Sequence, residues 1–466
     1  MVDASKTNAS DDVEVGIRPP PRRLIGLLAS IGPGIVVIGS VMGSGELINT
    51  PKQAAEFGFV LLWAVILSCV IKYFLQIEIG RHALAHNRTP LESLNSLPFP
   101  KFRGTSWIGL LFVATSIPTS LALAGMLGAT AGLLHALLPL GADATISAQI
   151  WMVILAIVIL ALLWRGVYQE MEKLITVLVL GFSVSVVMGL LLIQGTEFAI
   201  TRKELLSGLT FSLGDNPNLA AYAVISLMGA LGATANELFM YPYWILEKGY
   251  TKYVGSPDSQ GWTERTRGWI RVLQVDVGLC TILTTIITVA YFLIGASVLH
   301  AQGINPTGLG VVDELARMFT DTYGEWSRIV FLLGGFCTLF STMVVGLAAF
   351  GRMWGDTLVC LQFIPRDDPI KLKKSHRVVE VTYLIVLVPV ALLSQDPAAN
   401  VIFAQFFAGL VSTPLLMFAI CWLAFRTDKR VRMGKVSAVF LIASGIVIIA
   451  CVLIAAGHAV SEAISP

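Results

Sequence analysis

The sequence predicts an all-α membrane protein with eleven transmembrane helices, arranged as two inverted five-helix repeats plus one extra helix. Its 466 residues are 55% hydrophobic and only 13% charged, whereas an ordinary soluble domain has about 25% charged residues. Long apolar runs alternate with short charged segments along the whole chain. Two of these runs, five apart in order, are interrupted by glycine-rich segments that carry a carboxylate, which is the observation that suggests a repeat.

A membrane-spanning helix needs about 20 mainly apolar residues. Runs of about this length give the following predicted spans, numbered 1 to 11 in chain order: 28–54, 57–80, 107–138, 148–164, 173–194, 219–247, 271–299, 328–360, 378–394, 398–425 and 436–458.

The distribution of Lys and Arg predicts the orientation of these spans. With the N-terminus inside, 25 of the 32 basic residues fall on inner segments, and the outer segments hold only Arg202, Lys203, Arg317 and Arg328. Inner loops of membrane proteins are enriched in Lys and Arg in this way. We therefore expect a cytoplasmic N-terminus, an extracytoplasmic C-terminus and a multi-pass protein of the plasma membrane (the cell inner membrane).

The predicted spans divide the chain into four regions. We expect a disordered cytoplasmic tail over 1–24, a first five-helix repeat over 25–200 and a second over 201–426. The last region, 427–466, would hold the eleventh helix and a short extracellular tail. The six cysteines lie in or next to apolar runs without metal-ligand spacing, so we interpret them as small core residues.

No enzyme motif is present in the sequence, since it has no P-loop, no nucleophile elbow and no CxxC pair. A channel would favour a continuous pore over interrupted helices. We expect no resident cofactor and no nucleic-acid partner, because the basic residues are dispersed among loops. The expected partners are the lipid bilayer and a transported ion or small solute, and the oligomeric state is left open, a monomer included.

Spans 1 and 6 are the interrupted helices. Span 1 breaks at Gly43-Ser44-Gly45 with Glu46 directly after, and span 6 breaks over 232–237 within "GALGATANELFMYP". Lipid cannot satisfy the backbone groups that a break frees, so a break survives only where it is buried in protein or lines a polar cavity. Two broken helices at corresponding positions of two halves point to an inverted-repeat transporter with its binding site at the breaks.

The segment "GPGIVVIGSVMGSGELINTPKQAAEFGFVLLW" (32–63) resembles the first helix and the start of the second in the natural-resistance-associated macrophage protein (NRAMP) transporters. Weaker likenesses are "GATAGL" (128–133), "FSTMVVGLAAFGRM" (340–353) and "FAQFF" (403–407). Together they cover most of the chain. The resemblance implies a LeuT-type fold of two inverted five-helix repeats and transport of divalent transition metals, usually with protons.

The chain departs from the family at the metal site. The family's Asp-Pro-Gly-Asn aligns with residues 43–46, so that Gly43 replaces the ligand Asp and Glu46 replaces the ligand Asn. Its Met-Pro-His-Asn aligns with residues 233–236, so Ala233 replaces the thioether ligand and Ala235 the histidine. Soft thioether ligands favour late transition metals. We therefore expect no tight binding of Mn²⁺ or Cd²⁺.

The family's route for protons is altered as well. Its acidic residues on the third helix align with Ala122 and Gly125, neither of which can titrate. Proton coupling by that route is therefore not expected.

The polar groups left at the two breaks carry oxygen. The predicted substrate site consists of Gly43, Ser44, Gly45, Glu46, Ala233, Thr234, Asn236, Glu237 and Gln405, with Glu46, Asn236 and Glu237 as metal ligands. Oxygen-only coordination suits hard cations such as Mg²⁺, Mn²⁺ or Na⁺. The favoured interpretation is a secondary transporter of a hard divalent cation, or a Na⁺-linked transporter, rather than a carrier of late transition metals.

The same glycines allow a second interpretation. Backbone N–H groups at the start of a half-helix can hold an anionic group. The Gly-Ser-Gly segment would then bind a small anionic or zwitterionic solute, such as an amino acid or a carboxylate, in a coupled transporter. Two further charges, Lys72 and Glu78, are expected near the inner end of span 2, where long side chains reach toward water.

Overall fold

The structure is a computed structural model that describes residues 16–21, 23, 26–27, 43–141, 143–165, 168–307, 311–365, 368–394 and 396–464. Within these residues, nine helices are long and apolar enough to cross a membrane. Predicted span 1 is described from Gly43 onward, and span 5 contains a shorter apolar helix over Val179–Gly195. Eleven spans therefore stay a prediction. The Gly-Pro-Gly segment at 32–34 and most of the predicted tail lie outside the described residues.

The first half of the chain contains spans 1 to 5 and a short antiparallel hairpin that pairs Lys101 with Ser106. Its elements are α3 (Thr50–Phe57), α4 (Leu62–His86), α5 (Pro90–Asn95), β1 (Lys101–Phe102), β2 (Thr105–Ser106), α6 (Trp107–Thr119), α7 (Leu121–Leu137), α8 (Ala144–Arg165) and α9 (Tyr168–Leu192). Span 3 was expected as one helix but divides at Ser120 into α6 and α7. Pro118 precedes this joint, and a proline within a helix removes a backbone donor and favours such an interruption.

The second half contains spans 6 to 11. Its helices are α10 (Arg202–Ser207), α11 (Pro217–Ala230), α12 (Ala235–Glu247), α13 (Tyr250–Val254), α14 (Trp262–Ile294), α15 (Val311–Tyr323), α16 (Ser327–Cys360), α17 (Pro369–Leu393), α18 (Pro397–Phe407), α19 (Thr413–Arg426) and α20 (Lys435–Ile464). The helices of spans 7 and 9 begin earlier than their apolar runs, at Trp262 and Pro369. Helical hydrogen bonding continues beyond the apolar layer, so charged first turns do not end these helices.

Corresponding helices of the two halves pack against one another. Span 2 (α4) contacts span 7 (α14), and span 3 (α7) contacts span 8 (α16). Span 3 also packs on span 4 (α8) as span 8 packs on span 9 (α17). This matched packing is what an inverted repeat requires.

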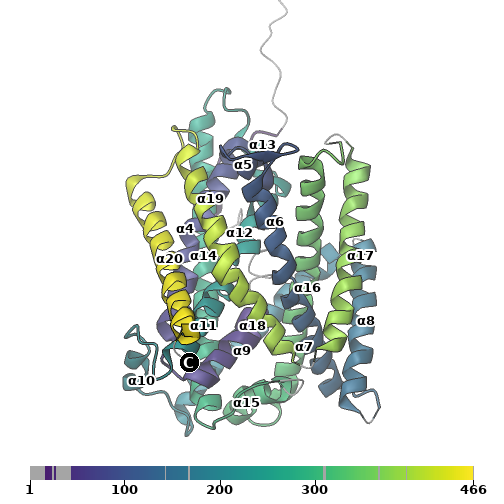
Figure 1. Cartoon of the computed structure of the whole chain (residues 1–466), viewed down its shortest axis with the longest axis vertical. Helices are drawn as coiled ribbons and strands as arrows, with labels where there is room; N and C mark the ends of the chain where they lie inside the picture. The colour runs from purple at the N-terminus through teal and green to yellow at the C-terminus, as the bar shows by residue number, and fades with distance from the viewer. Residues whose placement is uncertain are drawn as a thin grey trace, which may run out of the picture.

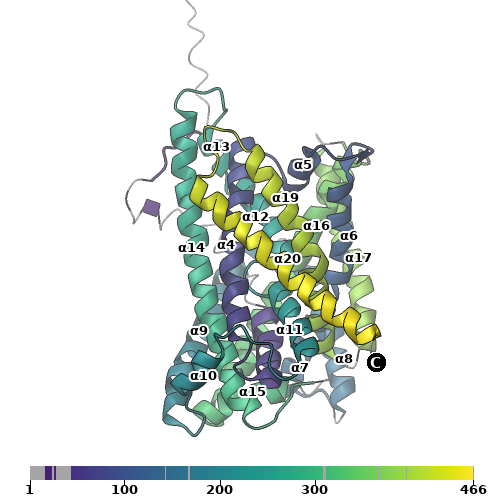
Figure 2. The same ribbon diagram turned by 60° about the vertical axis from the view of Figure 1, so that its left-hand side comes forward.

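The outer helices present apolar side chains to the surroundings. Ile157 on α8, Ile385 on α17 and Val439 on α20 are each more than half exposed. Figure 2 shows α20 running obliquely across the outside of the bundle. Apolar side chains on the outside of long helices suit a lipid environment.

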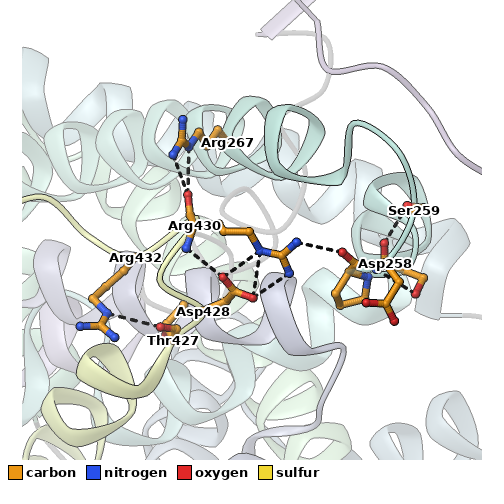
Figure 3. A network of polar contacts seen from close by, with 9 residues as sticks. Asp258, Ser259, Arg267, Thr427, Asp428, Arg430 and Arg432 are labelled. Carbon is orange, nitrogen blue, oxygen red and sulfur yellow. Dashed lines mark hydrogen bonds and ion pairs between the residues drawn. The ribbon is translucent and has the colours of Figure 1, made fainter.

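The short helices lie at the two ends of the bundle, with α5 and α13 at one end and α10 and α15 at the other (Figure 1). At the α13 end, the loop before α14 is hydrogen-bonded to the loop between α19 and α20 (Figure 3). The guanidinium of Arg430 donates to Asp428 Oδ2 at 2.9 Å and to the carbonyl of Pro257 at 3.1 Å. Arg267 in turn donates to the carbonyl of Arg430 at 2.8 Å. Hydrogen bonds from Arg430 lower the pKa of the Asp428 carboxyl.

The predicted orientation places the α13 end inside the cell, and cysteine labelling tests it. Ser256 lies in the loop before α14 and Ala144 begins α8, and both are exposed at opposite ends of the bundle. In intact cells, a membrane-impermeant maleimide should label Ala144→Cys but should label Ser256→Cys only after permeabilisation. The unsubstituted protein supplies the background from its own six cysteines. The reverse pattern would overturn the orientation.

Candidate functional site

At the predicted break in span 1, the described chain is helical from Ser44 onward and leads into α3. The residues just before Gly43 lie outside the described part of the chain, so the interruption itself stays a prediction, and we call Gly43–Gly45 the break in span 1. Gly43 and Ser44 precede one turn of π-helix over Gly45–Asn49, and the hydroxyl of Thr50 donates to the carbonyl of Gly45 at 2.9 Å. A Cβ atom at Gly45 would lie 3.1 Å from the carbonyl oxygen of Ala230, the last residue of α11. The absence of a side chain at Gly45 thus lets the break in span 1 lie close against the end of α11.

The break in span 6 separates α11 from α12. The chain is extended at Leu231 and turns at Gly232, where φ is +64°, a conformation that favours glycine. Helix α12 then begins with a capping box. The Thr234 hydroxyl accepts from the N–H of Glu237 at 3.3 Å, and the Glu237 carboxylate accepts from the N–H of Thr234 at 2.7 Å. Glu237 therefore also fixes the start of the second half-helix.

A cavity of about 140 Å³ lies where the two breaks meet the α6–α7 joint, α16 and α18. Seven of its lining residues carry polar side chains: Ser44, Thr119, Thr234, Asn236, Glu237, Thr342 and Gln405. Gly43 and Gly45 also line it. Of the nine residues predicted from the sequence, seven thus come together around one cavity, and Ala233 and Glu46 lie outside its lining.

The side-chain amide oxygen of Asn236 accepts no hydrogen bond. Its Nδ2 donates to Thr119 Oγ1 at 3.3 Å, and the Thr119 hydroxyl itself donates to the carbonyls of Thr115 and Ser116. The Thr119 oxygen must therefore act as the acceptor toward Asn236, which fixes the orientation of the amide. Oδ1 of Asn236 is buried and has no hydrogen-bond partner. A buried acceptor left in this way favours a cation or a water as its partner.

Gln405 on α18 repeats this arrangement. Its Nε2 donates to Ser44 Oγ at 3.2 Å, which connects α18 to the break in span 1. Its Oε1 is buried and, like Oδ1 of Asn236, has no hydrogen-bond partner. Two amide oxygens from different helices are thus available at the same cavity, together with the carboxylate of Glu237.

Glu46 points away from the cavity. Its side chain is 1% exposed, and its Oε2 accepts from the N–H of Gly43 at 3.2 Å. Its Oε1 accepts from Thr288 Oγ1 on α14 at 3.4 Å. The carboxyl group therefore occupies one backbone donor of the Gly-Ser-Gly segment, on the side of the segment away from the cavity.

Lys72 was assigned by sequence reasoning to the inner end of span 2, and that assignment is wrong. The side chain is 2% exposed, and Nζ donates to the carbonyl of Leu231 at 2.5 Å, at the break in span 6. Glu78 is likewise buried, in an ion pair with Arg81 at 3.0 Å. Arg81 also donates to the carbonyl of Val431 in the α19–α20 loop, so Glu78 does lie toward the α13 end, but its carboxylate is paired inside the protein and does not reach water. The helix of span 2 itself extends to His86, six residues past the predicted end.

Beyond the breaks, the cavity continues between α12 and α16 toward the α13 end. Trp244, Phe350 and Met353 line this part. The two helices are joined there by side chains. Arg352 forms an ion pair with Glu247 at 2.8 Å, and the Tyr243 hydroxyl donates to Asp356 at 2.6 Å.

These features define a class of protein: a membrane transporter of the broken-helix, inverted-repeat type, with its cavity at the two breaks. The sequence model of one family, described as natural resistance-associated macrophage protein-like (Nramp), matches residues 34–460. The chain belongs to this family, which confirms the resemblance noted in its sequence. It is a transporter and not an enzyme.

The relatives and similar structures agree with this. A divalent metal cation transporter, MntH, of Klebsiella pneumoniae (strain 342) is 25% identical over 395 residues, covering 84% of this chain and 85% of the relative. A manganese transporter of Eremococcus coleocola, solved with an aromatic bis-isothiourea compound, has a TM-score of 0.67 at 17% identity and covers 96% of this chain and 91% of that one. MhsT in complex with L-phenylalanine has a TM-score of 0.60 at 17% identity, covering 95% and 100%. These structures show the shared fold.

Proposed function

We propose that this protein is a secondary transporter of a hard divalent cation such as Mg²⁺, which binds in the cavity with part of its hydration shell. The observation that carries the proposal is the pair of unpartnered amide oxygens, Oδ1 of Asn236 and Oε1 of Gln405, beside the carboxylate of Glu237. Mg²⁺ prefers oxygen ligands and usually keeps several waters, so that one or two carboxylates suffice to hold it.

The composition of the site supports a hydrated ion. Among the residues that the structure describes, no three His, Cys, Asp or Glu side chains are grouped as a metal site would group them. A bare transition metal would lack ligands here, whereas a partly hydrated hard ion brings its own. The Klebsiella relative is named as a divalent metal cation transporter, and this supports a divalent ion as the cargo of this protein.

The second interpretation, a small anionic or zwitterionic solute, is less favoured. It relies on backbone N–H groups of the Gly-Ser-Gly segment as donors, but the N–H of Gly43 already donates to Glu46. The N–H of Gly43 is thus already used by Glu46 and is not a donor to a solute in the cavity. The carboxylate of Glu237 at the cavity would also repel an anion.

Amide replacement tests the cation site. Asn236→Leu and Gln405→Met keep the bulk of the side chains but remove their oxygens. In proteoliposomes with an entrapped Mg²⁺ dye, we expect each to reduce uptake at least about tenfold, which corresponds to ~1.4 kcal/mol. Gln302→Met is the matched control, because this exposed amide binds Asp321 at the other end of the bundle, and its uptake should equal that of the unsubstituted protein.

The same liposomes separate the alternatives. Mg²⁺ should be carried and Cd²⁺ should not, because Ala233 replaces the family's thioether ligand and the groups proposed to hold the ion are oxygens. Met126, Met240 and Met353 also line the cavity, so Cd²⁺ uptake is the direct test of whether a soft ligand takes part. Robust Cd²⁺ uptake would overturn the choice of a hard cation. Thermal stabilisation by amino acids or carboxylates alone, with no response to any metal salt, would replace the proposal by the organic-solute interpretation.

A further inference from the structure

Lys72 places a positive charge at the break in span 6. It lies in the middle of α4, it is 2% exposed, and Nζ donates to the carbonyl of Leu231 at 2.5 Å. Leu231 caps the C-terminal end of α11. The C-terminal end of a helix carries partial negative charge on its unsatisfied carbonyls and attracts cations.

The local backbone brings this carbonyl to the lysine. Gly232 follows Leu231, and a Cβ atom at Gly232 would lie 3.1 Å from Cα of Cys69 on α4. The turn of the break therefore rests directly on the backbone of α4, three residues before Lys72. Because the backbones of the break and of α4 lie this close together, the Lys72 ammonium reaches the Leu231 carbonyl while the side chain stays buried.

Two acidic side chains lie near the buried ammonium. Glu46 behind the span 1 break and Glu237 in the capping box both interact electrostatically with Lys72, and the Cys69 thiol is the other ionisable group near it. A lysine at the centre of a membrane span is costly, and such residues usually have a functional role. The Lys72 ammonium is thus a cation that belongs to the chain itself, and it lies between the C-terminal end of α11 and nearby acidic side chains.

Groups of the same kind hold the coupling ions of broken-helix transporters. In such proteins, unwound backbone carbonyls and the C-terminal ends of half-helices coordinate Na⁺ or a proton. We infer that the Lys72 ammonium is a tethered cation that permanently occupies this position, so that the protein neither binds nor requires Na⁺ there. The inference goes beyond the proposed cargo and holds whichever solute the cavity carries.

Removing the ammonium should create a site for a small free cation. Lys72→Ala leaves the Leu231 carbonyl and the two carboxylates around an empty volume. We expect the melting temperature (Tm) of this variant to fall by several degrees in choline chloride. At constant ionic strength, Na⁺, Li⁺ or ammonium should restore a large part of the loss, and the response should saturate. Thermal unfolding of the purified protein measures this without any cargo.

Three proteins control for a purely structural role. Lys72→Met fills the volume without charge, so it should be destabilised but should not respond to small cations. Lys52→Ala removes another lysine that donates to a backbone carbonyl, that of Pro306 at 2.8 Å, and it should show no selective response. The unsubstituted protein should have the same Tm in Na⁺ and in choline.

Each outcome decides between a tethered cation and a structural lysine. A Lys72→Ala protein that responds alike to Na⁺, Li⁺, ammonium and choline would overturn the inference, and so would an unsubstituted protein that Na⁺ stabilises selectively. If Lys72→Ala yields no folded protein, Lys72→Arg takes its place as the variant that keeps the charge. Its insensitivity to Na⁺ would support the tethered cation, and selective stabilisation of Lys72→Arg by Na⁺ would overturn it.

Discussion

Gly229→Ala should abolish the accumulation of folded protein. A Cβ atom at Gly229 would lie 1.9 Å from the carbonyl oxygen of Gln405, so that α11 and α18 are in backbone contact here. Ordinary overpacking of a core costs roughly 1–3 kcal/mol, and a clash with a backbone atom cannot be relieved by rotating a side chain. Small residues at helix contacts permit such close approach in membranes. Yield and monodispersity in size-exclusion chromatography measure the effect.

Gly181→Ala is the matched control for this substitution. Gly181 lies within α9, and an added Cβ would meet no atom within 4 Å. Alanine is favoured over glycine in a helix by roughly 0.5–1 kcal/mol, so this variant should fold with unchanged or slightly higher stability. A Gly229→Ala protein with the yield and Tm of the Gly181→Ala protein would contradict the backbone contact.

Arg81→Met should destabilise the protein by about 3–5 kcal/mol, because it leaves the buried carboxylate of Glu78 without its partner. Glu78 and Arg81 form an ion pair at 3.0 Å with almost no exposed side-chain area, and Arg81 also donates to the carbonyl of Val431. The double variant with Glu78→Gln removes the orphaned charge and should recover much of the loss. Thermal or denaturant unfolding of the purified proteins measures both.

An exposed ion pair provides the comparison. Arg328 and Asp313 pair at 2.5 Å, but their side chains are 41% and 64% exposed. Arg328→Met should therefore cost less than about 1 kcal/mol, as is usual for ion pairs in water. Equal losses for Arg81→Met and Arg328→Met would contradict the buried state of the first pair.

The two breaks could be located from the sequence because glycines and polar residues are costly inside an apolar run unless they line a polar cavity or a close helix contact. The same reasoning brought Ser44 and Asn236 into one site, the resemblance of span 10 to the family added Gln405, and the structure places all three on one cavity. The direction in which the Glu46 side chain points could not be predicted from the sequence. Ser44 and Glu46 are two positions apart, and the width of the turn over Gly45–Asn49 sets which of them faces the cavity.

The burial of the charged side chains in span 2 was the other feature that the sequence alone left undetermined. The apolar run of span 2 ends near residue 80, but the helix continues to His86 through residues that are charged and yet buried. The partner of Lys72, the Leu231 carbonyl, comes from a distant part of the chain, and no hydropathy pattern encodes that contact. The partner of Glu78, Arg81, is three residues away on the same helix, so this pair could be read from the sequence, but its burial could not.

The glycine contacts of α11 also determine how closely the walls of the cavity are joined. A Cβ atom at Gly409 would lie 2.1 Å from the carbonyl of Ile225, so α11 and the segment after α18 touch along their backbones. Helix α12 is joined to α16 by the side-chain ends of Glu247 and Tyr243, and it packs closely on α4, where a Cβ atom at Gly80 would lie 2.8 Å from the ring of Tyr241. Side-chain ends can exchange their partners for water, whereas parted backbones would leave a void. The two sides of the cavity are therefore joined unequally: the contacts of α11 cannot open without a void, whereas those between α12 and α16 can be replaced by water.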